Sequence, residues 1–197
     1  MNDARRAAVD RETVVNAFDV MGRYLRERSL IGEIAVYGGT AIVLQFRWRT
    51  ATEDVDVTIR TGERESAVKD AAALAATRLG LADDWLNNYV GAFTPETESQ
   101  AFFLTYGSYP RGETPGLRVF LAKPEYLCAM KLKALQRENV DDRDFEDAIN
   151  LAVEIAVETA DQLQRLFAAF FPDEKLHPNA AARLPELVQQ IRLRRKG

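Results

Sequence analysis

The sequence predicts an α+β protein in which a small mixed β-sheet flanked by helices is followed by a helical C-terminal lobe. Up to about residue 122, apolar or alternating segments typical of strands lie between segments with the three- and four-residue apolar spacing of helices. From Lys123 onward only the helical spacing remains. We therefore expect a core over residues 1–122 and a helical lobe over residues 123–197, joined by a linker too short for independent domains.

The composition narrows the class of protein. The chain has 197 residues, a formal net charge of −4, 47% hydrophobic residues and 28% charged residues, which together indicate a soluble globular protein. No apolar run is long enough to span a bilayer, and the N-terminal segment lacks the apolar centre of a secretory signal. We expect a cytoplasmic protein with no membrane partner. The negative charge argues against a surface that binds nucleic acid throughout, but it allows a local basic groove.

The single cysteine and the single histidine exclude two kinds of site. Cys128 stands in an apolar segment, where a buried inert thiol is expected, and it has no partner for an internal disulfide. His177 precedes a proline, is expected in a surface loop, and cannot make a zinc site alone. Any metal must therefore be held by carboxylates, which indicates Mg²⁺ or Mn²⁺.

The first elements follow from their patterns. Asp10 is expected to cap a helix that runs to about Arg28. Residues 34–39, IAVYGG, form a buried strand that ends at a double glycine. A helix follows over residues 40–46 and, after a polar connection, a strictly alternating strand over residues 54–60.

The later elements are predicted with the same rules. Ser66 is expected to cap a helix that ends near Leu79, and residues 81–93 are expected to form a short helix and a loop. Strands are predicted over residues 100–106 and 117–122. Four helices are expected in the helical lobe. The first covers residues 124–138 with Pro124 at its first position, and the second covers residues 143–156 and is capped by Asp142. The third begins after a capping box of Thr159 and Gln162, and the fourth ends at the basic C-terminus.

The predicted strand over residues 54–60 carries two carboxylates on one face. Because side chains alternate along a strand, Asp54, Asp56 and Thr58 share one face, and the apolar residues between them share the other. Two carboxylates this close repel each other, and a divalent cation relieves the repulsion. A DxD strand by itself is more often a solvated edge.

The double glycine is a candidate phosphate-binding turn. Gly38 and Gly39 lead directly into a helix, so a phosphate can approach the free backbone N–H groups of the helix start. Thr40 adds a hydroxyl donor. A double glycine alone is usually a simple turn. Together with a pair of metal-binding carboxylates, however, it meets the requirements of phosphoryl or nucleotidyl transfer.

The order of these motifs resembles that of a known superfamily. A strand, two glycines, a short helix and a DxD strand are similar to the signature of the DNA polymerase β nucleotidyltransferases. More closely, YGGTAIVLQF, TEDVDV, DDWLNN, LRVFLAKPEYLCAMKLKA and DDRDFEDAINLA resemble the AbiEii-like bacterial nucleotidyltransferases, some of which are toxins of toxin–antitoxin pairs. The resemblance spans roughly Ile34 to Leu151 and implies a nucleotidyltransferase fold, an NTP substrate and magnesium.

The resemblance also implies site residues in the helical lobe. Lys131 matches the lysine of a KLxA motif, and an RDxxD motif matches Arg143, Asp144 and Asp147. Lys131 could neutralise phosphate charge, and Asp144 and Asp147 share one face at a helix start. The alternative is that the two aspartates favour the helix N-terminus and pair structurally with Lys131 or Arg143.

One departure from the superfamily concerns its third carboxylate, which lies on a later strand and can act as a general base. The predicted strands over residues 100–106 and 117–122 contain no acidic residue. Asp144 or Asp147 could replace it, the acceptor could be activated differently, or the enzyme could be catalytically weak.

Two further segments have both a functional and a structural interpretation. Arg47, Trp48 and Arg49 could contact a triphosphate or a nucleic-acid acceptor, although a solvated loop explains them as well. Asn87 and Asn88 belong to the DDWLNN segment that matches the family, although an aromatic anchor with a polar turn accounts for them equally.

The sequence predicts an NTP-dependent nucleotidyltransferase with a metal-binding site and a nucleotide-binding site. The predicted acceptor is tRNA or protein, and the predicted role is that of a toxin with a cognate antitoxin. The alternatives are a catalytically weak or inactive binding module with the same fold, and a small-molecule (antibiotic) nucleotidyltransferase. The predicted residues are catalytic Asp54, Asp56, Lys131 and Asp144; metal-binding Asp54 and Asp56; nucleotide-binding Gly38, Gly39, Thr40 and Lys131; and, in addition, Asp147 and Arg143.

Overall fold

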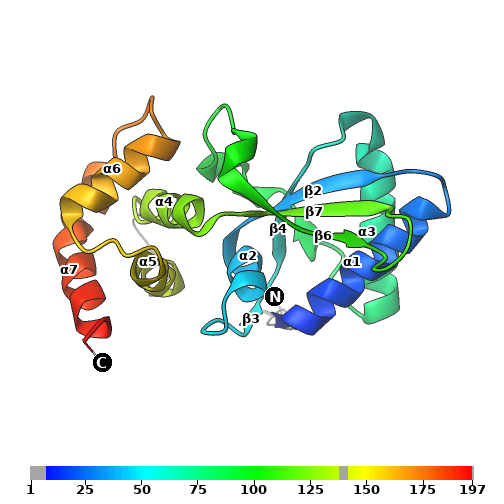
Figure 1. The fold of residues 1–197 in the computed structure, drawn as a ribbon, viewed down its shortest axis with the longest axis horizontal. Coiled ribbons are helices and arrows are strands. Elements are labelled where there is room, and N and C mark those ends of the chain that lie inside the picture. The colour runs from blue at the N-terminus through cyan, green and yellow to red at the C-terminus, as the bar shows by residue number, and fades with distance from the viewer. Residues whose placement is uncertain (1–7, 138–141, 197) are drawn as a thin grey trace, which may run out of the picture. The chain divides into compact units, whose positions relative to one another are not determined.

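A computed structural model describes residues 8–137 and 142–196, which form two compact units (Figure 1). The sheet unit contains residues 8–92 and 103–122, and the helical unit contains residues 93–102, 123–137 and 142–196. The segment 93–102 thus belongs to the helical unit although it precedes Lys123 in the chain. Within the described part of the chain, no helix combines the length and the apolar character that a membrane span requires.

The sheet unit is built on a five-stranded mixed sheet with the strand order β5-β4-β2-β7-β6. The central strand β2 (Gly32–Val36) runs antiparallel to β4 (Val55–Ile59) and parallel to β7 (Leu117–Ala122). At the edges, β5 (Leu86–Asn87) runs parallel to β4, and β6 (Phe103–Tyr109) runs antiparallel to β7. The small mixed sheet that the sequence predicts is therefore confirmed, with β5 as a strand that its pattern did not predict.

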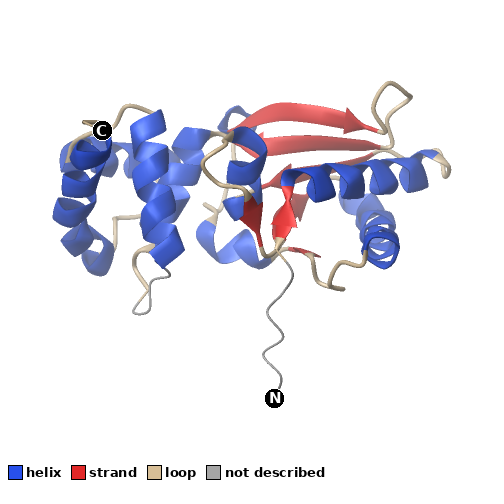
Figure 2. Ribbon diagram, turned by 90° about the horizontal axis from the view of Figure 1, so that it is seen from below, coloured by secondary structure: helices blue, strands red, loops and turns tan. Residues whose placement is uncertain are grey.

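Helices α1 (Arg11–Arg26) and α3 (Glu65–Leu79) pack against each other and lie on the same face of this sheet (Figure 2). The predicted cap of α1 is confirmed, because the Asp10 side chain accepts a hydrogen bond from the Thr13 N–H at 2.8 Å. The predicted cap of α3 is wrong. A 3₁₀ turn over Gly62–Arg64 leads directly into α3, which begins at Glu65. Ser66 therefore lies inside the helix and does not cap it.

The remaining parts of the sheet unit are short. Helix α2 (Gly38–Gln45) begins directly after β2 and packs against β4 and β3 (Ala51–Thr52). Strand β3 pairs antiparallel with β1 (Val9–Asp10). In the two units together, 3₁₀ turns occupy Gly62–Arg64, Tyr89–Phe93 and Gln100–Phe102.

The two faces of the sheet differ in polarity. Strand pairing places Val36 beside Val57 and Leu121, and all three side chains are buried. The next residues along the strands point to the opposite face, as alternation requires. We call this opposite side the polar face, and it carries Glu33, Asp56, Thr58, Arg60, Arg118 and Phe120.

The helical unit consists of α4 (Pro124–Ala134), α5 (Asp142–Glu154), α6 (Ala160–Phe170) and α7 (Pro178–Arg194). Helix α4 packs against α5 and α6, and α5 packs against α7. Pro124 at the first turn of α4 and the capping box of α6 are confirmed. Asp142 lies inside α5 instead of capping it. The predicted helix over residues 124–138 ends at Ala134, and its last residue, Glu138, lies outside the described residues.

Aromatic packing explains why the segment 93–102 belongs to the helical unit. The Phe102 ring lies 5.0 Å from the Tyr126 ring and 4.8 Å from the Phe170 ring, between centroids. The Tyr126 hydroxyl also donates to Glu98 Oε1 at 2.6 Å. Cys128 of α4 is fully buried, and burial raises the pKa of its thiol to about 12, which fits the inert thiol expected from the sequence.

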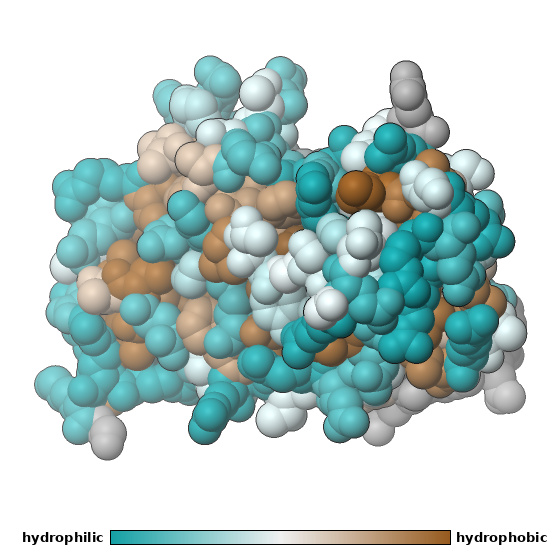
Figure 3. Space-filling model, turned by 45° about the vertical axis from the view of Figure 1, so that its right-hand side comes forward, coloured by the Kyte–Doolittle hydropathy of each residue, from teal (hydrophilic) through white to brown (hydrophobic). Residues whose placement is uncertain are grey.

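Exposed hydrophobic residues are scattered in the described part of the chain. On the face shown in Figure 3, hydrophobic residues form groups that hydrophilic residues interrupt. The large hydrophobic side chains that are classed as exposed are Leu79, Tyr89 and Leu193. Single exposed side chains of this kind are normal on a protein surface.

Candidate functional site

Asp54 and Asp56 lie at the start of β4. Val55 and Val57 are buried on the side that faces the helices, whereas Asp56 and Thr58 are half-buried on the polar face. Asp54, one residue before the strand, is half-buried as well. The alternation that the sequence predicted for this strand is confirmed.

Gly38 lies directly against Asp56. Its φ of +56° belongs to the left-handed region, and a Cβ atom at this position would stand 2.6 Å from Asp56 Oδ2. The Tyr37 N–H donates to the Asp56 carbonyl oxygen at 2.9 Å, so the end of β2 is tied to β4 at the same point. The turn into α2 and the Asp56 carboxylate are therefore neighbours, and only glycine satisfies both the backbone conformation and the contact.

Gly39 and Thr40 have partners within the protein. A Cβ atom at Gly39 would stand 2.6 Å from Arg49 Nη2 and 2.6 Å from Thr52 Oγ1, so a larger residue here would force these side chains to shift. Thr40 is fully buried, and its hydroxyl donates to the Asp54 carbonyl oxygen at 2.7 Å. The hydroxyl predicted to donate to phosphate thus links the start of α2 to the residue before β4.

Asn87, which was named from the sequence only as part of the DDWLNN segment, lies beside the aspartate pair. Strand β5 pairs with β4 so that Asn87 stands opposite Asp56, and its Nδ2 donates to Asp54 Oδ2 at 3.3 Å. Its Oδ1 accepts from the Tyr89 N–H at 2.9 Å, which fixes the orientation of the amide. Buried Trp85 anchors β5, because its Nε1–H donates to the Ala72 carbonyl oxygen at 3.0 Å. The family-like segment DDWLNN was the available signal for this residue.

The two strands on the other side of β2 from β4, β7 and β6, supply no further carboxylate. Neither β6 nor β7 contains an acidic residue. On the polar face, the Arg60 guanidinium lies 3.8 Å from the centroid of the Phe103 ring, and the hydroxyls of Tyr37 and Thr58 are 2.9 Å apart. The sheet therefore presents a pair of aspartates with aromatic, cationic and hydroxyl neighbours.

Three of the predicted residues of the helical unit form an ion-pair cluster. Lys131 Nζ lies 2.6 Å from Asp144 Oδ1 and 2.8 Å from Asp147 Oδ2. The three side chains are largely buried, with exposed fractions of 12%, 15% and 5%. Arg143 is exposed on the first turn of α5. This pairing is the structural alternative that the sequence left open, and the role of these residues in transfer stays a prediction.

Comparisons with known proteins bear on the fold. No family model matches the chain, and no curated protein matches it. Its structure is similar to the crystal structure of an antigenic nucleotidyltransferase-like protein from Paracoccidioides brasiliensis, with a TM-score of 0.51 and 15% sequence identity over 94% of this chain and 95% of that chain. This chain has a nucleotidyltransferase-like fold. At this level of identity the likeness concerns the fold alone.

Within this nucleotidyltransferase-like fold, Asp54 and Asp56 suit a hard divalent cation. In the described part of the chain, no group of three or more His, Cys, Asp or Glu side chains could hold a metal ion. Two carboxylates are nevertheless enough for Mg²⁺, which is commonly bound by one or two carboxylates together with substrate phosphates and water. The donor set therefore fits a magnesium ion that arrives with a triphosphate rather than a metal site built from protein alone.

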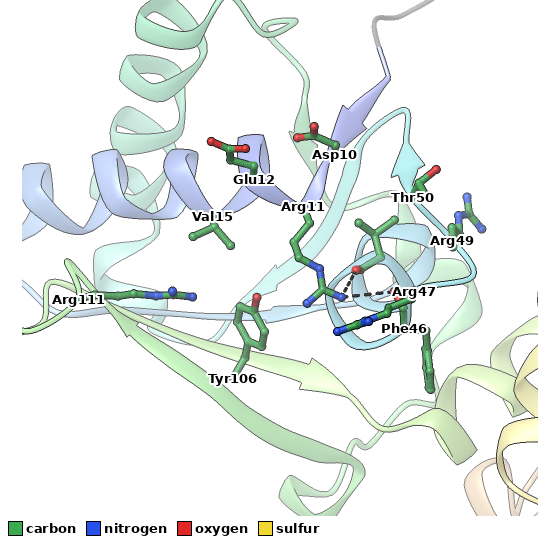
Figure 4. A pocket seen from close by; sticks show the side chains of 11 residues that line it. Asp10, Arg11, Glu12, Val15, Phe46, Arg47, Arg49, Thr50, Tyr106 and Arg111 are labelled. Atoms are coloured by element: carbon green, nitrogen blue, oxygen red, sulfur yellow. Dashed lines mark hydrogen bonds between the residues drawn. The ribbon is translucent and has the colours of Figure 1, made fainter.

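The sheet unit of the nucleotidyltransferase-like fold also contains an open pocket of about 600 Å³ (Figure 4). Neither the aspartate pair nor Gly38, Gly39 and Thr40 line it. Arg49 lines the pocket, and its side chain is also one of the two that lie nearest to the Cβ position of Gly39. The pocket and the glycine turn are therefore neighbouring but distinct places.

Proposed function

We propose that this protein transfers a nucleotide from an NTP to an acceptor, with Mg²⁺ or Mn²⁺ held by Asp54 and Asp56. The observation that carries the proposal is the contact between the Asp56 carboxylate and Gly38 at the start of α2. Because of this contact, the aspartate pair lies beside a helix N-terminus in a nucleotidyltransferase-like fold, which supports the proposal. A cation site next to a phosphate-binding turn is the combination that nucleotidyl transfer requires.

Each residue has a distinct task in this proposal. Asp54 and Asp56 bind the cation, and the cation, when bound, neutralises negative charge on the triphosphate. The free N–H groups at the start of α2 bind a phosphate oxygen. Asn87 orients Asp54, because its amide donates a hydrogen bond to one of the carboxylate oxygens.

We propose that the acceptor is activated without a third carboxylate from the sheet. This view is supported by β6 and β7, which contain no acidic residue. The same observation favours a second candidate function, which is a module that binds nucleotides without turnover.

The finer assignments are proposals that rest on the sequence. The motifs between Ile34 and Leu151 support an AbiEii-like enzyme that modifies tRNA or protein as the toxin of a toxin–antitoxin pair. The same motifs support roles for Lys131 and Asp144 in transfer, besides their ion pair.

Labelling experiments test the proposal. The protein is incubated with each α-labelled NTP, Mg²⁺, and total cellular RNA or protein. We expect label in one acceptor class, and we expect EDTA or Asp56→Asn to abolish it. Asp70→Asn is the matched control, because Asp70 is exposed on α3 and has no place in the site.

The outcomes separate the candidates. Normal labelling by folded Asp56→Asn protein removes the aspartates from the mechanism. Mg²⁺-dependent NTP binding by the wild type, without label in any acceptor, supports the binding module instead.

A further inference from the structure

The pocket of the sheet unit gathers positive charge that the proposed transfer does not use. It is lined from the start of α1, the end of α2 with the loop after it, strand β6 and the hairpin loop between β6 and β7. Four arginines and two carboxylates line it: Arg11, Arg47, Arg49 and Arg111 against Asp10 and Glu12. This excess of cations stands in a chain whose formal net charge is −4.

Three of the arginines make no ion pair with a carboxylate in the described part of the chain. Among the ion pairs of the described residues, none involves Arg11, Arg47 or Arg111. Arg11 Nη2 donates to the Val43 carbonyl oxygen at 2.7 Å, which holds its guanidinium at the end of α2. Like charges that converge on one cavity repel each other, so an anion bound between them is favoured.

The carboxylates are turned away from this charge. The Asp10 carboxylate is engaged with the start of α1, where the hydrogen bond from Thr13 N–H lowers its pKa. Figure 4 shows Asp10 and Glu12 pointing away from Tyr106, whereas Arg11, Arg47 and Arg111 extend toward it. The region around Tyr106 is therefore cationic.

The same region offers a flat ring. The Tyr106 side chain lies between Arg111 on one side and Arg11 and Arg47 on the other (Figure 4). Apolar side chains complete the lining: Val15, Val43 and Phe46. Guanidinium groups bind phosphate oxygens well, and an aromatic ring stacks on a planar base.

We propose that this pocket binds a phosphorylated small molecule of nucleotide size, with its phosphate on Arg47, Arg111 and Arg11 and its planar ring against Tyr106. A volume of about 600 Å³ lies in the range of small-molecule sites. The negative net charge of the chain and the carboxylates at the edge of the pocket disfavour a long polyanion. The site goes beyond the proposed transfer, and it needs no divalent cation because arginines supply the charge.

Calorimetric titration of the four nucleoside monophosphates into the full chain, in EDTA, tests the proposal. We expect at least one of them to bind the wild-type protein, and Arg47→Gln or Arg111→Gln to weaken that binding about ten-fold. Both side chains are exposed, so the variants should fold. Arg192→Gln removes the same charge from an exposed position on α7 and should leave binding unchanged.

Asp56→Asn separates this proposal from the proposed function. The pocket lies outside the aspartate pair, so Asp56→Asn should bind the monophosphate normally even if it loses transfer. The proposal is overturned if no monophosphate binds, if Arg192→Gln weakens binding as much as the pocket variants, or if Asp56→Asn abolishes binding. It is also overturned if inorganic phosphate binds as tightly as the monophosphate, or if a short single-stranded RNA binds far more tightly through the same arginines.

Discussion

Gly38 shows how one residue combines a backbone requirement with a chemical one. Its φ of +56° strains any residue with a Cβ atom, and that atom would also meet Asp56 Oδ2. We expect Gly38→Ala to lower the free energy of unfolding by about 1–2 kcal/mol and to displace the Asp56 carboxylate. Mg²⁺-dependent NTP binding should therefore weaken. Chemical denaturation and equilibrium binding measure the two effects.

Gly80→Ala is the matched control for that experiment. Gly80 has a φ of +66° at the end of α3, and a Cβ atom there would meet nothing within 4 Å. The control should lose a similar amount of stability and bind NTP normally. If both variants bind equally well, the contact with Asp56 does not matter for the site.

Asn87 is the other informative single residue, because it holds the orientation of Asp54. Removing a group that orients a metal ligand typically weakens metal affinity or activity by about 10–100-fold. We expect Asn87→Ala to raise the Mg²⁺ concentration required for NTP binding by at least about ten-fold. Asn88→Ala, which changes the exposed neighbouring residue, should behave as wild type. An identical Mg²⁺ titration for the two variants would leave Asn87 with a structural role only.

At the scale of elements, helices α4 and α5 are joined by the ion pairs of Lys131 with Asp144 and Asp147. Lys131→Ala would leave two largely buried carboxylates close together without their shared cation. We expect a loss of about 3 kcal/mol in the free energy of unfolding, measured by urea denaturation. Lys69→Ala, which breaks an exposed pair with Glu65, should cost about 0.5 kcal/mol or less.

The same variant reports on the predicted role of Lys131 in transfer. Activity per folded molecule should stay normal if the lysine only joins the two helices, and it should fall if the lysine also binds triphosphate. A stability like that of the wild type would show that the ion pairs contribute little.

At the scale of the whole molecule, local sequence patterns predicted the main elements of the fold, whereas contacts between distant elements were not predicted. The mixed sheet and the helical lobe followed from apolar spacing, and the caps at Asp10 and Thr159 followed from neighbours in the sequence. The predictions failed where a neighbour from another element decides. Strand β5 is too short to show a period, and the segment 93–102 belongs to the helical unit through the aromatic contacts of Phe102.

The sequence by itself determined the fold class, the alternation that brings Asp54 and Asp56 to one face, and the passage from a strand through two glycines into a helix, although α2 begins at Gly38 and not after the glycines. These features depend on residues only a few positions apart, so the periodicity of apolar residues along the sequence is enough to predict them. Only the tertiary structure decided that Asp56 contacts Gly38, that Asn87 holds Asp54, and that arginines from separate elements share one pocket. Those contacts depend on strand order and register, because hydrophobic burial brings together segments that the sequence keeps far apart.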